Sequence, residues 1–191
     1  MERKFELSPR IENVREVKPV VIPVQFELAE IKHHFDESVQ SIISQFTVAE
    51  SLVSSGQEAA AKNIFRSQIV FIEGVLDFYM HEITKYGLYK IFIGEWSRTE
   101  KYSKLSVSMA DVDRALHKPD AKEWFFDYVN KSFATVVMQD WIIIRDQLNL
   151  IGIPWKDVCQ SIHEKMDESH SVAEEKRVLS ELYKRRNAIA H

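Results

Sequence analysis

The sequence predicts an all-α fold: a multi-helix bundle of long antiparallel helices, preceded by an extended N-terminal arm. Two observations indicate helices. Apolar residues recur at spacings of three and four through residues 25–191, the period of an amphipathic helix. Only 5 glycines and 5 prolines occur in the 191 residues, too few to supply the turns of a sheet. Residues 1–24 lack the helical period, which separates an arm from one helical domain.

The arm is expected to lie extended, in part as an edge strand, on the body of the protein or on a partner. Pro19 and Pro23 disfavour a helix there, because proline removes a backbone donor and restricts the preceding residue. The other apolar residues of the arm are mostly β-branched: Val14, Val17, Val20, Val21 and Val24. A packed strap explains this composition better than a functional tail does.

Two long amphipathic helices are predicted next. Residues 54–56 end the first one, and Gly87 is expected to stop the second. A short loop between two long helices implies an antiparallel hairpin. The first apolar stripe is Leu28, Ile31, Phe35, Val39, Ile42, Phe46, Ala49 and Val53, and the second is Phe65, Ile69, Ile72, Leu76, Tyr79, Ile83 and Tyr86.

Shorter helices should follow, to give a bundle of five to seven. Residues 88–107 are irregular and could hold a short helix or a crossing loop. Further helices are predicted over residues 109–117, over residues 124–148 as one helix or a pair, and over residues 155–166. After a connector at residues 167–170, the final helix begins at Ser171-Val172-Ala173-Glu174, which has the form of a capping box.

Composition bounds the class of protein. The net charge of −4 and the pI of about 6.0 argue against a surface coated with basic residues, although a small basic site remains compatible with them. Cys159 is the only cysteine, which excludes an intramolecular disulfide and favours a reducing compartment. The first residues lack the apolar core of a signal peptide, and the apolar runs are too short to span a membrane. We expect a cytoplasmic protein.

The residues that could bind a metal form no convincing set. His33 and His34 are adjacent and point to different faces of a helix. Cys159 and His163 have a usable i, i+4 spacing, but no third or fourth ligand accompanies them. We therefore expect no metal and no cofactor.

Three polar residues of the second long helix share one face. Glu73, Asp77 and His81 follow each other at spacings of four. The commoner interpretation is a solvated polar face. The same face could instead support a catalytic group if it met the end of the last helix.

The end of the last helix is the stretch that most suggests chemistry. Projected at about 100° per residue, Arg186 lies close to the apolar stripe of Val178, Leu179, Leu182 and Ile189. A half-buried guanidinium needs a carboxylate or a phosphate, because an unpaired buried charge is costly. His191 lies about 140° away on a straight helix. Either the helix breaks near Asn187 or a second copy of the chain completes the site. Basic residues that merely complement the helix dipole are the plainer alternative.

Residues 186–191, Arg-Asn-Ala-Ile-Ala-His, resemble the signature of the HEPN superfamily, an arginine followed by four to six residues and a histidine. Asn187 fills the polar position that often follows the arginine, and the long helices are similar to the ribonuclease-LS/phage-suppressor branch. The resemblance implies an all-α homodimer with facing motifs. Many members are metal-independent endoribonucleases of toxin–antitoxin or antiphage systems, whereas others are non-catalytic binding or antitoxin modules.

The resemblance also implies roles for the motif residues, with RNA as the substrate and a protein antitoxin as a further partner. His191 would exchange protons with the ribose 2′-hydroxyl or the leaving oxygen, and Arg186 would hold the phosphate. Asn187 would orient one of them, while Lys184 and Arg185 would contact the RNA backbone. Cleavage would leave a 2′,3′-cyclic phosphate and a 5′-hydroxyl.

The end of the chain bears on activity. Members of the family usually continue into a further helix, so we expect the natural chain to extend past His191. A terminal carboxylate at that position would raise the histidine pKa and repel phosphate. In a purely structural bundle, by contrast, Arg186 should pair with an internal carboxylate such as Glu73 or Asp77, with no opening to solvent.

Overall fold

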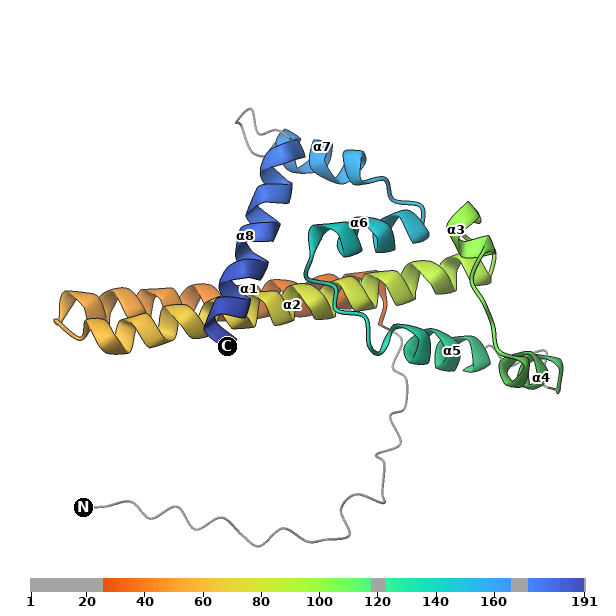
Figure 1. Cartoon of the computed structure of the whole chain (residues 1–191), viewed down its shortest axis with the longest axis horizontal. Helices are drawn as coiled ribbons and strands as arrows, with labels where there is room; N and C mark the ends of the chain where they lie inside the picture. The colour runs from red at the N-terminus through yellow and green to blue at the C-terminus, as the bar shows by residue number, and fades with distance from the viewer. Residues whose placement is uncertain (1–25, 118–122, 166–171, 191) are drawn as a thin grey trace, which may run out of the picture.

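The computed structural model describes residues 26–117, 123–165 and 172–190, which form eight helices and no strand (Figure 1). The all-α bundle is confirmed, with more helices than the five to seven expected. The short helix allowed for in residues 88–107 is a single turn, and the segment predicted over residues 124–148 holds a pair of helices. The helices are α1 (Leu28–Ser54), α2 (Glu58–Phe92), α3 (Glu100–Ser103), α4 (Met109–His117), α5 (Glu123–Phe133), α6 (Trp141–Leu150), α7 (Trp155–Lys165) and α8 (Val172–Ala190). The predicted arm and the capping serine of the last helix lie outside the described residues.

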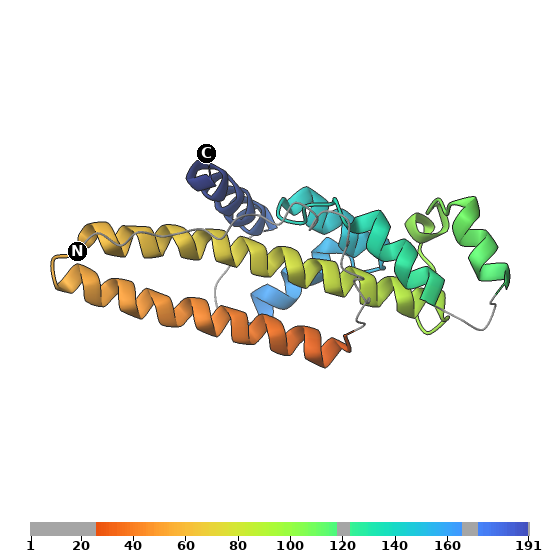
Figure 2. The ribbon, with the colours of Figure 1, turned by 90° about the horizontal axis from the view of Figure 1, so that it is seen from below.

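The antiparallel pair α1 and α2 is the long axis of the molecule (Figures 1 and 2). Gly56 closes α1 at φ 75°, where Gln57 N–H donates to the Leu52 carbonyl at 2.8 Å and Gly56 N–H donates to the Val53 carbonyl at 3.0 Å. This left-handed cap satisfies carbonyls that the last turn leaves free. The tip of the hairpin extends beyond every other helix in both views.

The predicted stop of α2 at Gly87 is wrong. The helix runs on to Phe92, and the same left-handed cap occurs at Gly94, with φ 83°. Gly87 is needed for packing instead. A Cβ at Gly87 would lie 2.8 Å from the Cβ of Ile151, so only glycine lets the chain that follows α6 approach α2 this closely.

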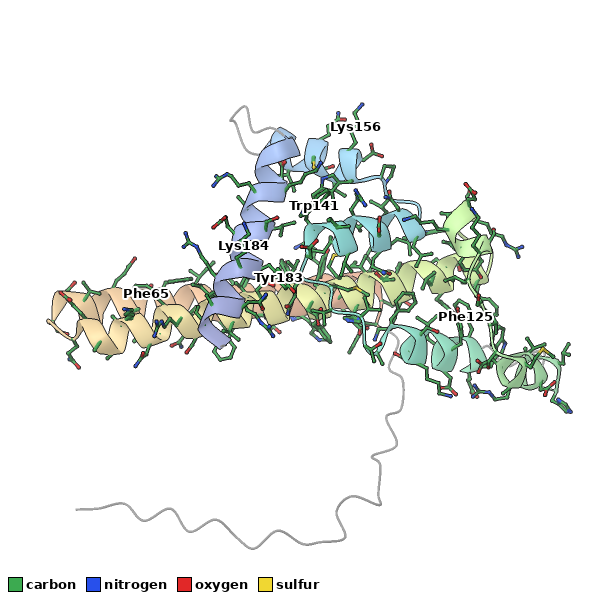
Figure 3. The ribbon with its side chains drawn as sticks, viewed as in Figure 1. Phe65, Phe125, Trp141, Lys156, Tyr183 and Lys184 are labelled. Carbon is green, nitrogen blue, oxygen red and sulfur yellow. The ribbon has the colours of Figure 1, made fainter. Side chains whose placement is uncertain are left out.

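The core surrounds the C-terminal half of α2. Phe125 on α5 stacks on Phe92 with ring centroids 4.2 Å apart, and α6 contributes Ile144 and Leu148 to the same buried cluster. Figure 3 shows Phe125 between α5 and α2. This half of α2 is therefore covered by α5 and α6, whereas its N-terminal half has α1 as its main neighbour. No helix of the described part of the chain is long and apolar enough to cross a membrane.

The last helix packs across the middle of α2, on the side away from α1 (Figure 2). α8 contacts α6 and α7 at its start and α2 further along. Along it, Leu179, Leu182 and Ile189 are half-buried, whereas Val178, also assigned to its apolar stripe, is 52% exposed. This placement brings the end of the sequence to the polar face of α2.

Candidate functional site

Arg186 is positioned by α8 at the helix crossing with α2. The helix continues through Asn187 to Ala190, so it does not break where the angular argument allowed a break. Arg186 and Asn187 are both half-buried, and the guanidinium Nη1 donates to Asn187 Oδ1 at 3.0 Å. The pair therefore acts as one polar unit on the inner side of α8.

Glu73 lies opposite this unit on α2. Its side chain is fully buried, and neither carboxylate oxygen has a hydrogen-bond partner. Burial raises its pKa from 4.5 to about 7, against the positive charge of Arg186, which lowers it, and Asp77 adds a smaller increase. Burial therefore favours the neutral form of this carboxyl group over its charged form.

The charges of Glu73 and Arg186 interact without direct contact. Among the described side chains, no ion pair or hydrogen bond joins Arg186 to Glu73 or to Asp77. Arg186 is nonetheless the positive charge that lowers the Glu73 pKa, so the electrostatic pairing expected of a structural arginine is present without a hydrogen bond. Because burial favours the neutral form of Glu73, the guanidinium of Arg186 is left able to pair with an anion.

Asp77 and His81 hold a neighbouring segment in place. The backbone N–H of Met138 donates to Asp77 Oδ1 at 2.5 Å. His81 Nε2 lies 2.9 Å from the Val136 carbonyl oxygen and 3.9 Å from Asp77 Oδ2. The predicted polar face is therefore not a solvated surface here, because both side chains anchor the link between α5 and α6 to α2.

Lys184 and Arg185 lie on the outer side of α8. Both are exposed, and Lys184 Nζ is 3.6 Å from Glu181 Oε1 with 72% of its side chain accessible. Figure 3 shows Lys184 and Tyr183 on α8 near its crossing with α2. A surface ion pair of this kind contributes little to stability, so the lysine is free to exchange partners.

His191, the predicted proton-transfer residue, lies outside the described residues. The described side chains contain no group of three metal-ligating residues. Cys159, considered with His163 as a metal pair, is 1% exposed. Burial first, and the nearby Glu175 next, raise the pKa of its thiol.

One neighbouring feature was missed by the sequence reasoning. A cavity of about 480 Å³ lies between α2 and α5, lined by His81, Lys85, Asn130 and Lys131 among others. Lys85 continues the row of Glu73, Asp77 and His81 by one more step of four, so the spacing could have revealed it. The contribution of α5 depends on tertiary packing and carries no local signal.

Comparisons with protein-family models, curated proteins and solved structures found no match for this chain. The site must therefore be interpreted from its own residues.

Proposed function

We propose that this chain is an endoribonuclease of the HEPN type, in which Arg186, Asn187 and His191 act on a phosphodiester of RNA. The proposal rests on the burial of Arg186 and on the side chains next to it. Arg186 is half-buried, bound to Asn187, and next to a carboxyl group whose pKa is about 7. A guanidinium in this state is suited to a phosphate, whose charge would complete the balance.

The reaction follows from general acid–base chemistry. The ribose 2′-oxygen attacks the neighbouring phosphorus and gives up its proton to a base, and the bond from phosphorus to the 5′-oxygen breaks. The leaving oxygen takes up a proton, so the products are a 2′,3′-cyclic phosphate and a 5′-hydroxyl. His191 is proposed to move these protons, and Arg186 to stabilise the charge that develops on the phosphate.

A second copy of the chain is part of the proposal. The absence of a break at Asn187 in α8 supports a composite site, in which a second subunit helps to bring Arg186 and His191 to one phosphate. Exposed Lys184 and Arg185 would then supply positive charge along the RNA on the outer side of α8. A protein antitoxin is a further partner that this function implies.

The test is cleavage of an end-labelled RNA pool in EDTA by the wild type and by Arg186→Ala and His191→Ala. His33→Ala and Arg98→Ala are matched controls, because both residues are exposed, His33 on α1 and Arg98 beyond the C-terminal end of α2. We expect the controls to retain activity and both site variants to lose at least about a hundredfold, the usual contribution of one such group. Equal cleavage by all five proteins, or none by the wild type, would refute the proposal.

A non-catalytic binding module is the second candidate. The net charge of −4 favours it, because an acidic chain is repelled by the phosphates of RNA. This alternative predicts a stable complex with a partner protein, no RNA turnover, and the same partner affinity for His191→Ala as for the wild type.

A further inference from the structure

A groove of about 780 Å³ runs between α1 and α2, on a different face of α2 from Glu73. Its apolar lining includes Phe71 and Phe78, which are 58% and 45% exposed. Ser41, Gln45 and Gln68 add polar groups to the same lining. Exposed aromatic rings beside hydrogen-bonding groups suit a segment of extended backbone, whose own polar groups need partners.

Gly74, in the wall of this groove, points to a close neighbour. Glycine in the interior of a helix is less favourable than alanine, so its presence needs a reason. A Cβ at Gly74 would meet no atom within 4 Å, in contrast to Gly87, where Ile151 requires the glycine. A segment lying along the groove would approach the α2 backbone at Gly74 and supply that reason.

The N-terminal segment joins the described structure at one end of this groove. The ring of Phe26 packs edge-on against His34, with centroids 5.0 Å apart, and lies 6.4 Å from the ring of Phe78. Both His34 and Phe78 line the groove. A segment that leaves Phe26 towards the N-terminus therefore starts at the groove and needs no connecting loop.

The length and composition of that segment fit the groove. From His34 to Gln45 the groove follows α1 for 11 residues, or about 16 Å at 1.5 Å per residue. Extended chain covers that length with about five residues. The residues before Phe26 are Pro-Val-Val-Ile-Pro-Val-Gln, at positions 19–25, which offer four β-branched side chains and two prolines without backbone donors.

We propose that residues 19–25 dock in the α1–α2 groove of their own chain, with their apolar side chains on Phe71 and Phe78 and their backbone close to Gly74. The groove is then an internal docking surface. The proposal is independent of the nuclease function, because it concerns another face of α2.

The test is disulfide trapping in the full chain. Ile22→Cys is combined with Ser41→Cys, which lines the groove, or with Ser44→Cys, an exposed serine of the same helix that is not among its lining residues. Cys159 can remain, because its burial and raised pKa keep it unreactive. Rates of cross-linking are read on non-reducing gels, and the linked peptides are identified by mass.

We expect the pair with Ser41→Cys to form within one chain at least about tenfold faster than the pair with Ser44→Cys, at a rate independent of protein concentration. Adding Gly74→Leu should slow the first pair to the rate of the second while the helical circular dichroism is unchanged. Equal rates at the two serines, links that join two chains, or no effect of Gly74→Leu would each overturn the proposal.

Discussion

Glu73 shows how one buried carboxyl group can govern a site without touching a ligand. Its charge costs free energy because no hydrogen bond replaces the lost water, and Arg186 offsets only part of this cost. The protonation of Glu73 therefore sets how much of the arginine charge is left for an anion. As the pH rises through the raised pKa, Glu73 ionises and would compete for Arg186 with the phosphate of the proposed site.

Replacing Glu73 by glutamine removes the titrating carboxyl group and therefore tests whether its pKa is raised. The folded pKa of about 7 lies above the ordinary 4.5, so the folded state holds more protons between these values and the wild type loses stability as pH rises through them. The full loss of unfolding free energy between these two pKa values is on the order of 3 to 4 kcal/mol. Glu73→Gln and the wild type should unfold at similar urea concentrations at pH 5, and the variant should be the more stable at pH 8.

Glu58→Gln, an exposed position of the same helix, is the control for this experiment. The difference in unfolding free energy between Glu58→Gln and the wild type should be constant with pH. The difference between Glu73→Gln and the wild type should vary with pH. A constant difference between Glu73→Gln and the wild type from pH 5 to 8 would show that the pKa of Glu73 is not raised.

At the scale of the element, α2 is the helix on which α1, α5, α6 and α8 pack. It pairs with α1, carries α5 and α6 on its C-terminal half, and is crossed by α8. Its C-terminal half contributes residues to the buried core, whereas part of its N-terminal half is exposed. Met80, Ile83, Leu88 and Ile91 belong to the core, whereas Phe71 is exposed.

Local sequence rules predicted what depends on local chemistry and failed where packing decides. The helix period and the Gly56 cap could be predicted, since both follow from neighbouring residues. Gly87 was interpreted as a stop because the contact with Ile151, 64 positions away, leaves no local signal. The inward aim of Arg186 followed from helical projection, but the burial of Glu73 requires the crossing of α8 over α2.

The close approach at Gly87 predicts a cost for the smallest side chain. Gly87→Ala would place Cβ within 2.9 Å of three atoms of Ile151, and both elements are backed by the core. Overpacking should exceed the gain in helix propensity, so the unfolding free energy should fall by about 1 to 3 kcal/mol. Asn63→Ala, on the exposed surface of α2, should change it by under about 0.5 kcal/mol. A Gly87→Ala protein as stable as the wild type in urea would contradict this packing.

Asp77 should matter for the link between α5 and α6 rather than for an exposed surface. Asp77→Ala removes the acceptor of the Met138 N–H and should cost about 1 to 3 kcal/mol of unfolding free energy, because that donor stays partly buried. Asp77→Asn keeps one acceptor oxygen and should cost less. Hydrogen exchange of the Met138 amide measures the effect, and unchanged exchange in Asp77→Ala would rule out the anchoring role.

At the scale of the whole molecule, α8 lies at the surface, with Lys184 and Arg185 exposed and Arg186 half-buried. Among the described side chains of α8 none is fully buried, and Val178 is 52% exposed. The second subunit of the proposed dimer would cover the outer side of α8. A twofold dimer would bring one copy of α8 towards the other and could join Arg186 of one chain to His191 of its partner.

Mixing two inactive variants distinguishes such a shared site from a site within one chain. Arg186→Ala and His191→Ala are each expected to be inactive in RNA cleavage. If each site takes Arg186 from one subunit and His191 from the other, a heterodimer of the two variants has one intact site and one site without either residue. Random pairing makes half of the dimers mixed, so co-refolding equal amounts should restore about a quarter of the wild-type activity.

A site within one chain leaves every subunit defective, and the mixture then stays as inactive as its components. Light scattering shows whether both variants still form dimers, which is needed for the comparison. Activity that stays at the level of the single variants in a dimeric mixture would place both residues of each site in the same chain.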